Sequence, residues 1–146
     1  MEEGLKGWMA GFFEGEGSIA IGKGHFENWR HPQYALQIVV SSSDLNRLNR
    51  LYDNFQGYIY ARKPRGQDKR GLYYRKPAYQ WILHGAKASD FLKEILPYLA
   101  QTSQAEVAIE FQKTIGVKVT AGIRKQREEL YNKMKSLNLQ QGKGRG

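Results

Sequence analysis

Hydrophobic and polar residues alternate along four segments of the chain, and a period of two is typical of strands that bury one face. Elsewhere apolar residues recur at spacings of three and four, the period of an amphipathic helix. The pattern predicts strands over residues 18–23, 34–40, 57–62 and 72–83. It predicts helices over an N-terminal segment that reaches residue 14, and over residues 45–55, 89–96, 102–115 and 121–139.

This order of elements, α-β-β-α-β-β-α-α followed by a C-terminal helix, predicts an α+β fold. A chain of 146 residues is long enough for one domain with a substantial core. We therefore expect a single domain over residues 1–139. Residues 140–146 are rich in Gly, Lys and Arg and are expected to form a basic, flexible tail.

Several residues mark where the elements begin and end. Asp44, which follows three serines, is suited to cap the helix after it, and Thr120 can cap the last helix. Pro97 ends the helix predicted over residues 89–96, and Gly116 ends the helix predicted over residues 102–115. Pro77 falls inside the fourth predicted strand, which indicates a bulge or an edge position there.

Small residues recur at helical spacing in the first helix and fall on or near one face: Gly7, Ala10, Gly11 and Gly15. Such a face lets a second helix approach closely. Glu14 and Glu16 stand where the helix should end, because Gly15 and Gly17 are helix terminators. Carboxylates oppose the helix dipole there unless a cation is bound. The pattern therefore indicates a divalent metal site shared between two helices.

The segment MAGFFEGEG, residues 9–17, resembles the signature of the LAGLIDADG homing endonucleases, with Glu14 and Glu16 in place of the two aspartates. Together with the order of elements, the resemblance extends over about residues 5–115, although only the first motif is specific. An ordinary amphipathic helix with an exposed acidic turn is the alternative, and the rest of the chain disfavours it. The resemblance implies four antiparallel strands that form a saddle over DNA.

The resemblance also implies a mechanism. Glu16 matches the acidic position that binds the metal directly, the Gly15 carbonyl is an auxiliary ligand, and Glu14 is a structural or cross-interface contact. Mg²⁺ is the expected cofactor, and Mn²⁺ or Ca²⁺ can occupy the same site. Members with one motif are homodimers, so the dimer interface is expected at Gly7, Ala10, Gly11 and Gly15, on a target that is nearly palindromic.

The chain departs from the family pattern at its basic catalytic residue. Family members often carry a lysine near the position of Thr102, which Gln101 precedes here. The basic residue is therefore either missing or supplied from elsewhere, such as by Arg47 or Arg50. The polar residue at the end of the second strand is expected among three serines, with Ser42 as the candidate. The predicted catalytic set is therefore Glu16, Glu14, Arg47 and Ser42.

Charge and composition agree with a nucleic-acid partner. The formal net charge is +9, and the chain has no cysteine. No apolar run of membrane-spanning length occurs. The sequence starts with the acidic residues Glu2 and Glu3, whereas a signal peptide starts with basic residues. We expect an intracellular protein, cytoplasmic or organellar, with no membrane partner and no small-molecule cofactor.

Charged, amide and aromatic residues are concentrated in the two predicted hairpins, and a two-stranded ribbon fits the major groove. Gln37, Tyr60 and Arg62 are expected to read bases, whereas Tyr79 and Trp81 are expected to pack in the core or an interface. The predicted DNA-binding residues are Lys23, His25, Asn28, Arg30, Gln33, Gln37, Tyr60, Arg62, Lys63, Arg65, Lys69, Arg70, Arg75 and Lys76.

These features favour a homodimeric, Mg²⁺-dependent endonuclease of the intron-homing type that cuts both strands of double-stranded DNA. The alternative is a binder on the same fold that does not cleave, either a maturase that acts on intron RNA or a DNA-binding regulator. The two acidic residues of the motif favour cleavage, whereas the missing lysine near Thr102 leaves the non-cleaving binder as an alternative.

Overall fold

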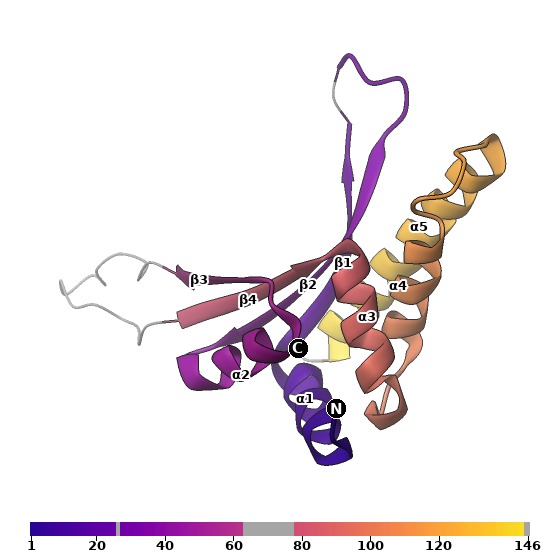
Figure 1. The fold of residues 1–146 in the computed structure, drawn as a ribbon. Coiled ribbons are helices and arrows are strands. Elements are labelled where there is room, and N and C mark those ends of the chain that lie inside the picture. Colours follow the sequence, from indigo (N-terminus) through magenta and orange to yellow (C-terminus); the bar gives the residue numbers. More distant parts are fainter. Residues whose placement is uncertain (26, 63–77, 145–146) are drawn as a thin grey trace.

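The computed structural model describes residues 1–25, 27–62 and 78–144 (Figure 1). Its elements follow the predicted order, with one additional 3₁₀ turn, η1. They are α1 (Glu3–Glu16), β1 (Gly17–Gly24), β2 (Gln33–Ser42), α2 (Leu45–Phe55), β3 (Tyr58–Arg62), β4 (Ala78–His84), α3 (Gly85–Ile95), η1 (Leu96–Tyr98), α4 (Ser103–Lys113) and α5 (Ala121–Gly144).

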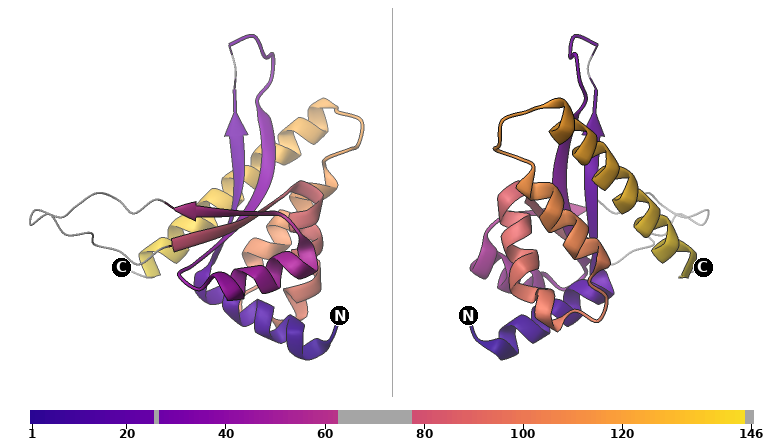
Figure 2. Two further views of the ribbon diagram at one scale, coloured as in Figure 1. Left: turned by 60° about the vertical axis from the view of Figure 1, so that its left-hand side comes forward. Right: turned by 90° about the vertical axis from the view of Figure 1, so that its right-hand side faces the viewer.

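The strands form one antiparallel sheet in the order β1-β2-β4-β3, which confirms the predicted α+β fold. The central strand β2 pairs Val40 with Gly17 on one side and with Trp81 on the other. Side chains on one face of the sheet are buried against the helices, including Ile19, Leu36 and Leu83. The β1–β2 hairpin projects beyond the helical layer, and α5 runs beside it (Figure 2).

Aromatic side chains make up the centre of the core. Phe91 of α3 contacts Phe13, Phe55 and Trp81, with ring centroids 5.0–5.6 Å apart. Trp81 is fully buried and its indole N–H donates to the Gln56 carbonyl at 2.7 Å. Tyr79 is partly buried against the same core. Both residues therefore pack on the helical side of the sheet, as expected.

The turn between α2 and β3 depends on a glycine. Gly57 has a φ of +97°, and a Cβ there would lie 2.6 Å from the Ile82 carbonyl oxygen. A side chain at residue 57 would therefore meet both strain and a clash. The start of α2 follows the prediction, because the Asp44 side chain accepts from the Asn46 N–H at 3.0 Å.

Three of the differences between the predicted and the observed elements matter most. Helix α1 continues through Gly15 to Glu16, and Gly17 alone ends it, where a Cβ would lie 2.7 Å from the Phe13 carbonyl oxygen. Helix α3 begins at Gly85 instead of residue 89, directly after β4. The part of the fourth predicted strand that contains Pro77, residues 72–77, lies outside the described residues.

The third difference is the length of α5. This helix runs to Gly144, through residues 140–144 of the expected flexible tail. It packs along α4 and beside β1. The Asn138 side chain donates to the Ile19 carbonyl at 2.9 Å, and Thr120 caps the first turn as expected. None of the described helices is both long and apolar enough to cross a membrane.

Candidate nucleic-acid interface and the end of helix α1

The face of the sheet opposite the helices carries cross-strand rows of residues, and three of these rows join three or four strands. The strand register places Ser41, Gln80 and Tyr60 in one row, Ser18, Val39, Ile82 and Tyr58 in the next, and Ala20, Gln37 and His84 in the third. Tyr58 and Tyr60 are 58% and 51% exposed. This face, which we call the open face, is the surface that a ligand of the sheet would meet.

Three of the predicted DNA-binding residues belong to the open face. Gln33 and Gln37 alternate with the buried residues of β2, and Tyr60 alternates with those of β3. Arg62 occupies a strand position of the same parity as Tyr60, although its side chain lies outside what the structure describes. The structure therefore brings the expected base-reading positions Gln37 and Tyr60 to one surface.

Lys23 is placed differently. Its ammonium contacts the Glu128 carboxylate of α5 at 3.0 Å, on the same side of the hairpin as the core residues Ile19 and Ile21. Tyr34 also donates to Glu128, and the Tyr34 and Tyr131 rings lie 5.7 Å apart. Lys23 thus helps to hold the hairpin against α5 and is not brought together with Gln37 and Tyr60. The sequence pattern missed this because α5 is remote from β1 along the chain.

The remaining predicted DNA-binding residues lie in the two hairpin loops. His25, Asn28 and Arg30 are exposed at the end of the β1–β2 hairpin. The pKa of the neighbouring His31 is lowered by desolvation and by the positive charge of Arg124. The second loop lies outside the described residues, and with it the predicted positions Lys63, Arg65, Lys69, Arg70, Arg75 and Lys76.

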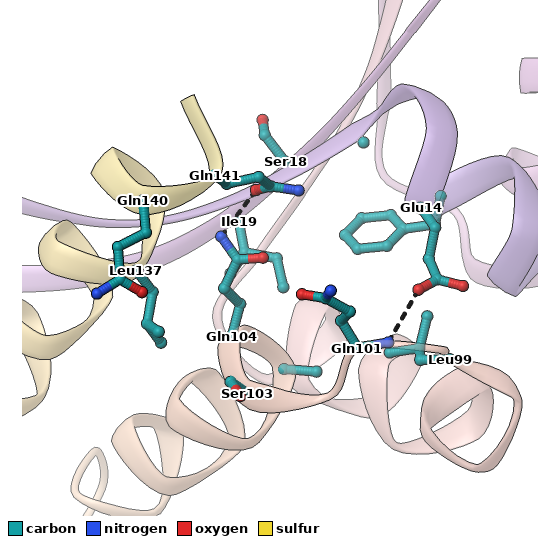
Figure 3. Close-up of a pocket in the computed structure, with 13 residues that line it drawn as sticks. Glu14, Ser18, Ile19, Leu99, Gln101, Ser103, Gln104, Leu137, Gln140 and Gln141 are labelled. Atoms are coloured by element: carbon teal, nitrogen blue, oxygen red, sulfur yellow. Dashed lines mark hydrogen bonds between the residues drawn. The ribbon is translucent and has the colours of Figure 1, made fainter. Parts of the chain in front are cut away.

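The two acidic residues of the motif have different surroundings. The Glu14 carboxylate accepts from the backbone N–H groups of Ala100 and Gln101 at 2.9 and 3.1 Å, which ties α1 to the segment before α4. Figure 3 shows the bond from Gln101. Glu16 is exposed at the last residue of α1, and no described residue hydrogen-bonds or ion-pairs with its carboxylate. Glu14 is therefore a structural anchor within the chain, whereas Glu16 is available to a ligand.

A cavity of about 560 Å³ lies beside Glu14, between the end of α1, the start of α4 and the last turns of α5 (Figure 3). Amide side chains line it, among them Gln101, Gln104, Gln140 and Gln141. Gln104 donates to Asn138 at 2.5 Å and to Gln141 at 2.9 Å. Sequence analysis missed the part of this wall that α5 supplies, because Gln140 and Gln141 fall in the segment expected to be a flexible tail.

The other two predicted catalytic residues lie together at the start of α2. The Ser42 hydroxyl accepts from the Asp44 N–H at 3.0 Å, and the Arg47 guanidinium lies 3.5 Å from the Asp44 carboxylate. Arg50, the alternative basic residue, stacks over the Trp8 ring of α1 at 4.4 Å. Of the two arginines, Arg50 is therefore the one that the structure places against the motif helix.

One side of α1 is open. A Cβ built at Gly4, Gly11 or Gly15 would meet no described atom within 4 Å, and one at Gly7 would lie 4.0 Å from the Tyr98 ring. Ala10, however, has no exposed surface, because it packs in the core. The expected interface therefore needs a correction: Ala10 is a core residue, and Gly4 joins the exposed stripe in its place.

The described part of a single chain forms no metal site with several acidic ligands. Among the described residues, no three His, Asp or Glu side chains are grouped so that they could hold a metal ion. Glu16 offers one free carboxylate, to which the backbone carbonyl of Gly15 can add an oxygen. Oxygen donors of this kind suit Mg²⁺, which keeps several waters and needs few protein ligands.

Comparison with known families and structures identifies close structural relatives. Residues 9–103 match the model of the family described as LAGLIDADG endonuclease. Two solved homing endonucleases have a similar fold. I-CvuI bound to its target has a TM-score of 0.70 and 20% identity, and the match covers 90% of this chain and 80% of that chain. Archaeal intron-encoded I-Vdi141I bound to DNA has a TM-score of 0.73 and 15% identity, and the match covers 93% of this chain and 85% of that chain.

A third structure differs in length. The DNA-bound meganuclease I-SmaMI has a TM-score of 0.66 and 17% identity over 88% of this chain, which covers only 44% of I-SmaMI. Comparison with curated protein sequences gives no match. At these identities the solved structures establish the fold, and the family model establishes the relationship.

Proposed function

This chain belongs to the LAGLIDADG endonuclease family, and on that premise we propose that it is a Mg²⁺-dependent, homodimeric endonuclease that cuts both strands of a long, nearly palindromic DNA target. The observation that carries the proposal is the end of α1, where Glu16 keeps a free carboxylate beside an uncovered helix face. The solved I-CvuI and I-Vdi141I structures, both described as complexes with a DNA target or DNA, support DNA as the substrate.

The open side of α1 supports the dimer. Gly4, Gly11 and Gly15 leave room for a second helix to approach backbone to backbone, as an isologous contact requires. The Trp8 ring flanks this stripe between Phe12, 5.2 Å away, and Arg50. A twofold axis along the stripe would bring two copies of Glu16 together. The dimer would carry a formal charge of twice +9, which suits a long polyanion.

The donor groups at the end of α1 fit Mg²⁺. Glu16 would bind it through the carboxylate, with the Gly15 carbonyl as an auxiliary ligand, and the partner copy would add a second carboxylate. When bound, Mg²⁺ supplies an activated water and neutralises charge on the phosphate and the leaving oxygen. Mn²⁺ or Ca²⁺ would bind the same oxygen donors.

The other residues near this end have supporting roles in the proposal. Glu14 fixes the segment before α4 relative to α1 through its two backbone contacts. Gln101 stands next to the position of the missing lysine and lines the neighbouring cavity, so its amide can order water there. Arg50 is held over Trp8, eight residues before Glu16, so we assign it to the middle of the motif helix and not to the metal-binding end.

Cleavage of a randomised duplex library tests the proposal. We expect double-strand ends at one motif with Mg²⁺, and none when EDTA removes the metal. Glu16→Gln should lower cleavage at least a hundredfold and leave DNA affinity within a fewfold of the unaltered protein, because it removes only the metal ligand. Glu129→Gln, which makes the same charge change on the exposed surface of α5, is the matched control.

Two results would contradict the proposal. If Glu16→Gln cleaves as fast as Glu129→Gln, the metal assignment is wrong. If the unaltered protein binds one DNA or RNA sequence selectively and never cleaves DNA, the protein is a maturase or a regulator on this fold.

A further inference from the structure

In the middle row of the open face, strands β2, β4 and β3 contribute two aliphatic side chains and an aromatic ring, where a DNA-binding surface is usually polar. We propose that Val39, Ile82 and Tyr58 recognise thymine through its C5-methyl group, so that the part of each half-site that meets this row is rich in A·T pairs. This inference rests on the proposed function as far as binding to duplex DNA, and it specifies which bases the sheet selects.

The strand register defines the row. Val39 of β2 pairs with Ile82 of β4, and Ile82 pairs with Tyr58 of β3. Each of the three alternates along its strand with residues that point into the core, such as Val40, Trp81 and Leu83. The row therefore lies on the open face, and Tyr58 leaves 58% of its surface in solvent.

Amide side chains border the row on both sides. Gln80, whose amide donates to the Ser41 hydroxyl at 3.3 Å, stands on one side, and Gln37 stands on the other. In the major groove an A·T pair presents the N6 and N7 positions of adenine, which suit glutamine, and the methyl group of thymine, which suits an apolar side chain. Amides and apolar groups in adjacent rows match these two features of the same base pair.

The neighbouring strand leaves space for a base edge to approach. On the open face β1 contributes only Ser18, Ala20, Gly22 and Gly24. These side chains reach less far than those of β2 and β4. A duplex on the saddle can therefore come close to β1 and bring its methyl groups within contact distance of Val39 and Ile82.

Aromatic rings extend the apolar surface of the middle row toward the edge strand β3. Tyr58 and Tyr60 stack with centroids 6.3 Å apart, and His84 lies 6.3 Å from Tyr58. A contiguous apolar patch on a basic protein is typical of an interaction site. In a DNA major groove the thymine methyl is the apolar group available for it.

Deoxyuridine tests the proposal, because it differs from thymidine only by the C5-methyl group. Binding sequences are first selected from a randomised duplex library made with thymine. The selected duplex is then compared with the same duplex in which each thymine is replaced by uracil. We expect thymine to be enriched among the selected sequences, and Kd to rise about fourfold for each contacted methyl group that is removed.

Variants that remove the methyl groups locate the contact. Val39→Ser and Ile82→Ser replace a branched apolar side chain of the row with a short hydroxyl side chain that has no methyl group. We expect each to reduce the thymine-over-uracil preference at least threefold. Val117→Ser, at a valine that is 46% exposed in the connection between α4 and α5, is the matched control and should keep the full preference.

The outcomes separate this proposal from the proposed function. Equal affinity for the thymine and uracil duplexes would overturn it and leave cleavage unaffected. A preference that survives in both Val39→Ser and Ile82→Ser would also overturn it, because the methyl contact would lie elsewhere. The comparison made with the unaltered protein stands even if a variant fails to fold. A lack of any selective binding to duplex DNA would overturn both proposals.

Discussion

Glu14 and Glu16 are two residues apart, yet their chemical surroundings separate their roles. The Glu14 carboxylate accepts two backbone N–H groups from the segment before α4. Hydrogen bonds to a charged acceptor are the stronger kind, and they are lost when the acceptor is removed. Glu16 makes no such contact with any described residue. One carboxylate therefore serves the fold and the other is left for a ligand.

This difference predicts that substitutions of Glu14 lower stability, whereas a substitution of Glu16 does not. Glu14→Ala should lower the free energy of unfolding by about 1–2 kcal/mol, because the N–H groups of Ala100 and Gln101 lose their acceptor. Glu14→Gln keeps one acceptor oxygen and should cost less. Glu16→Gln should leave stability unchanged. Denaturant unfolding of the three variants measures this, and an unaltered midpoint for Glu14→Ala would refute the anchor role.

At the residue scale the sequence predicted which side chains are important better than it predicted the residues that they contact. It indicated a structural role for Glu14, but its partners lie 86 and 87 residues further along the chain. Lys23 was predicted to bind DNA because it lies in a basic hairpin. The structure pairs it with Glu128, since α5 passes behind that hairpin. Ala10 matched the spacing of the small residues but turns into the core.

Among the elements, α1 connects the proposed dimer to the proposed chemistry, and Gly11 allows the two to be tested separately. A Cβ at Gly11 meets no described atom within 4 Å, and leucine favours a helix over glycine by about 1 kcal/mol. Gly11→Leu should therefore leave the monomer folded and disrupt the dimer. Sedimentation should show a monomer for Gly11→Leu and a dimer for the control Gly122→Leu, a substitution in α5. A dimer in both would exclude this interface.

The contact between α1 and α3 predicts a pH dependence. The Lys6 ammonium lies 2.8 Å from the Glu94 carboxylate. This hydrogen bond lowers the pKa of Glu94 and raises the pKa of Lys6. The Glu94 carboxylate therefore stabilises the fold at pH values above the ordinary carboxyl pKa, and this stabilisation is lost as the pH falls through the lowered pKa. The Lys6 ammonium stabilises the fold at pH values below the ordinary lysine pKa, and this stabilisation is lost as the pH rises through the raised pKa.

Thermal unfolding of Glu94→Gln checks this linkage. The variant should have a slightly lower Tm than the unaltered protein between about pH 5 and pH 10, because the pair is exposed and screened. The difference should close in acid, near pH 3 and below. Glu110→Gln removes an exposed pair with Lys113 within one helix, and is the matched control. A Tm difference that is constant across pH would show that the loss has another origin.

The periodic elements were the most predictable part of the fold. Alternation in β1 and β2 and the apolar stripe of α2 located these elements to within a few residues. The last turns of α5 could not be predicted in this way, since Gln140 and Gln141 have no apolar pattern. Their position depends on tertiary contacts, such as the one between Gln141 and Gln104.

At the scale of the whole molecule, four antiparallel strands form one sheet, and one side of α1 is left uncovered by the described residues. The sequence predicted the fold because one motif, residues 9–17, resembles a family signature, and the match over residues 9–103 places the chain in that family. The strand register then determines which side chains lie on the open face. That parity could not be derived from the sequence alone, because a slip of one residue exchanges the two faces.

The most direct test of the central claim is to map both ends of every cut that the purified protein makes in a randomised duplex library with Mg²⁺. The account predicts paired cuts in the two strands, related by the twofold symmetry of a nearly palindromic motif, and lost in Glu16→Gln. Selective binding without cuts, or cuts that persist in Glu16→Gln, would contradict it.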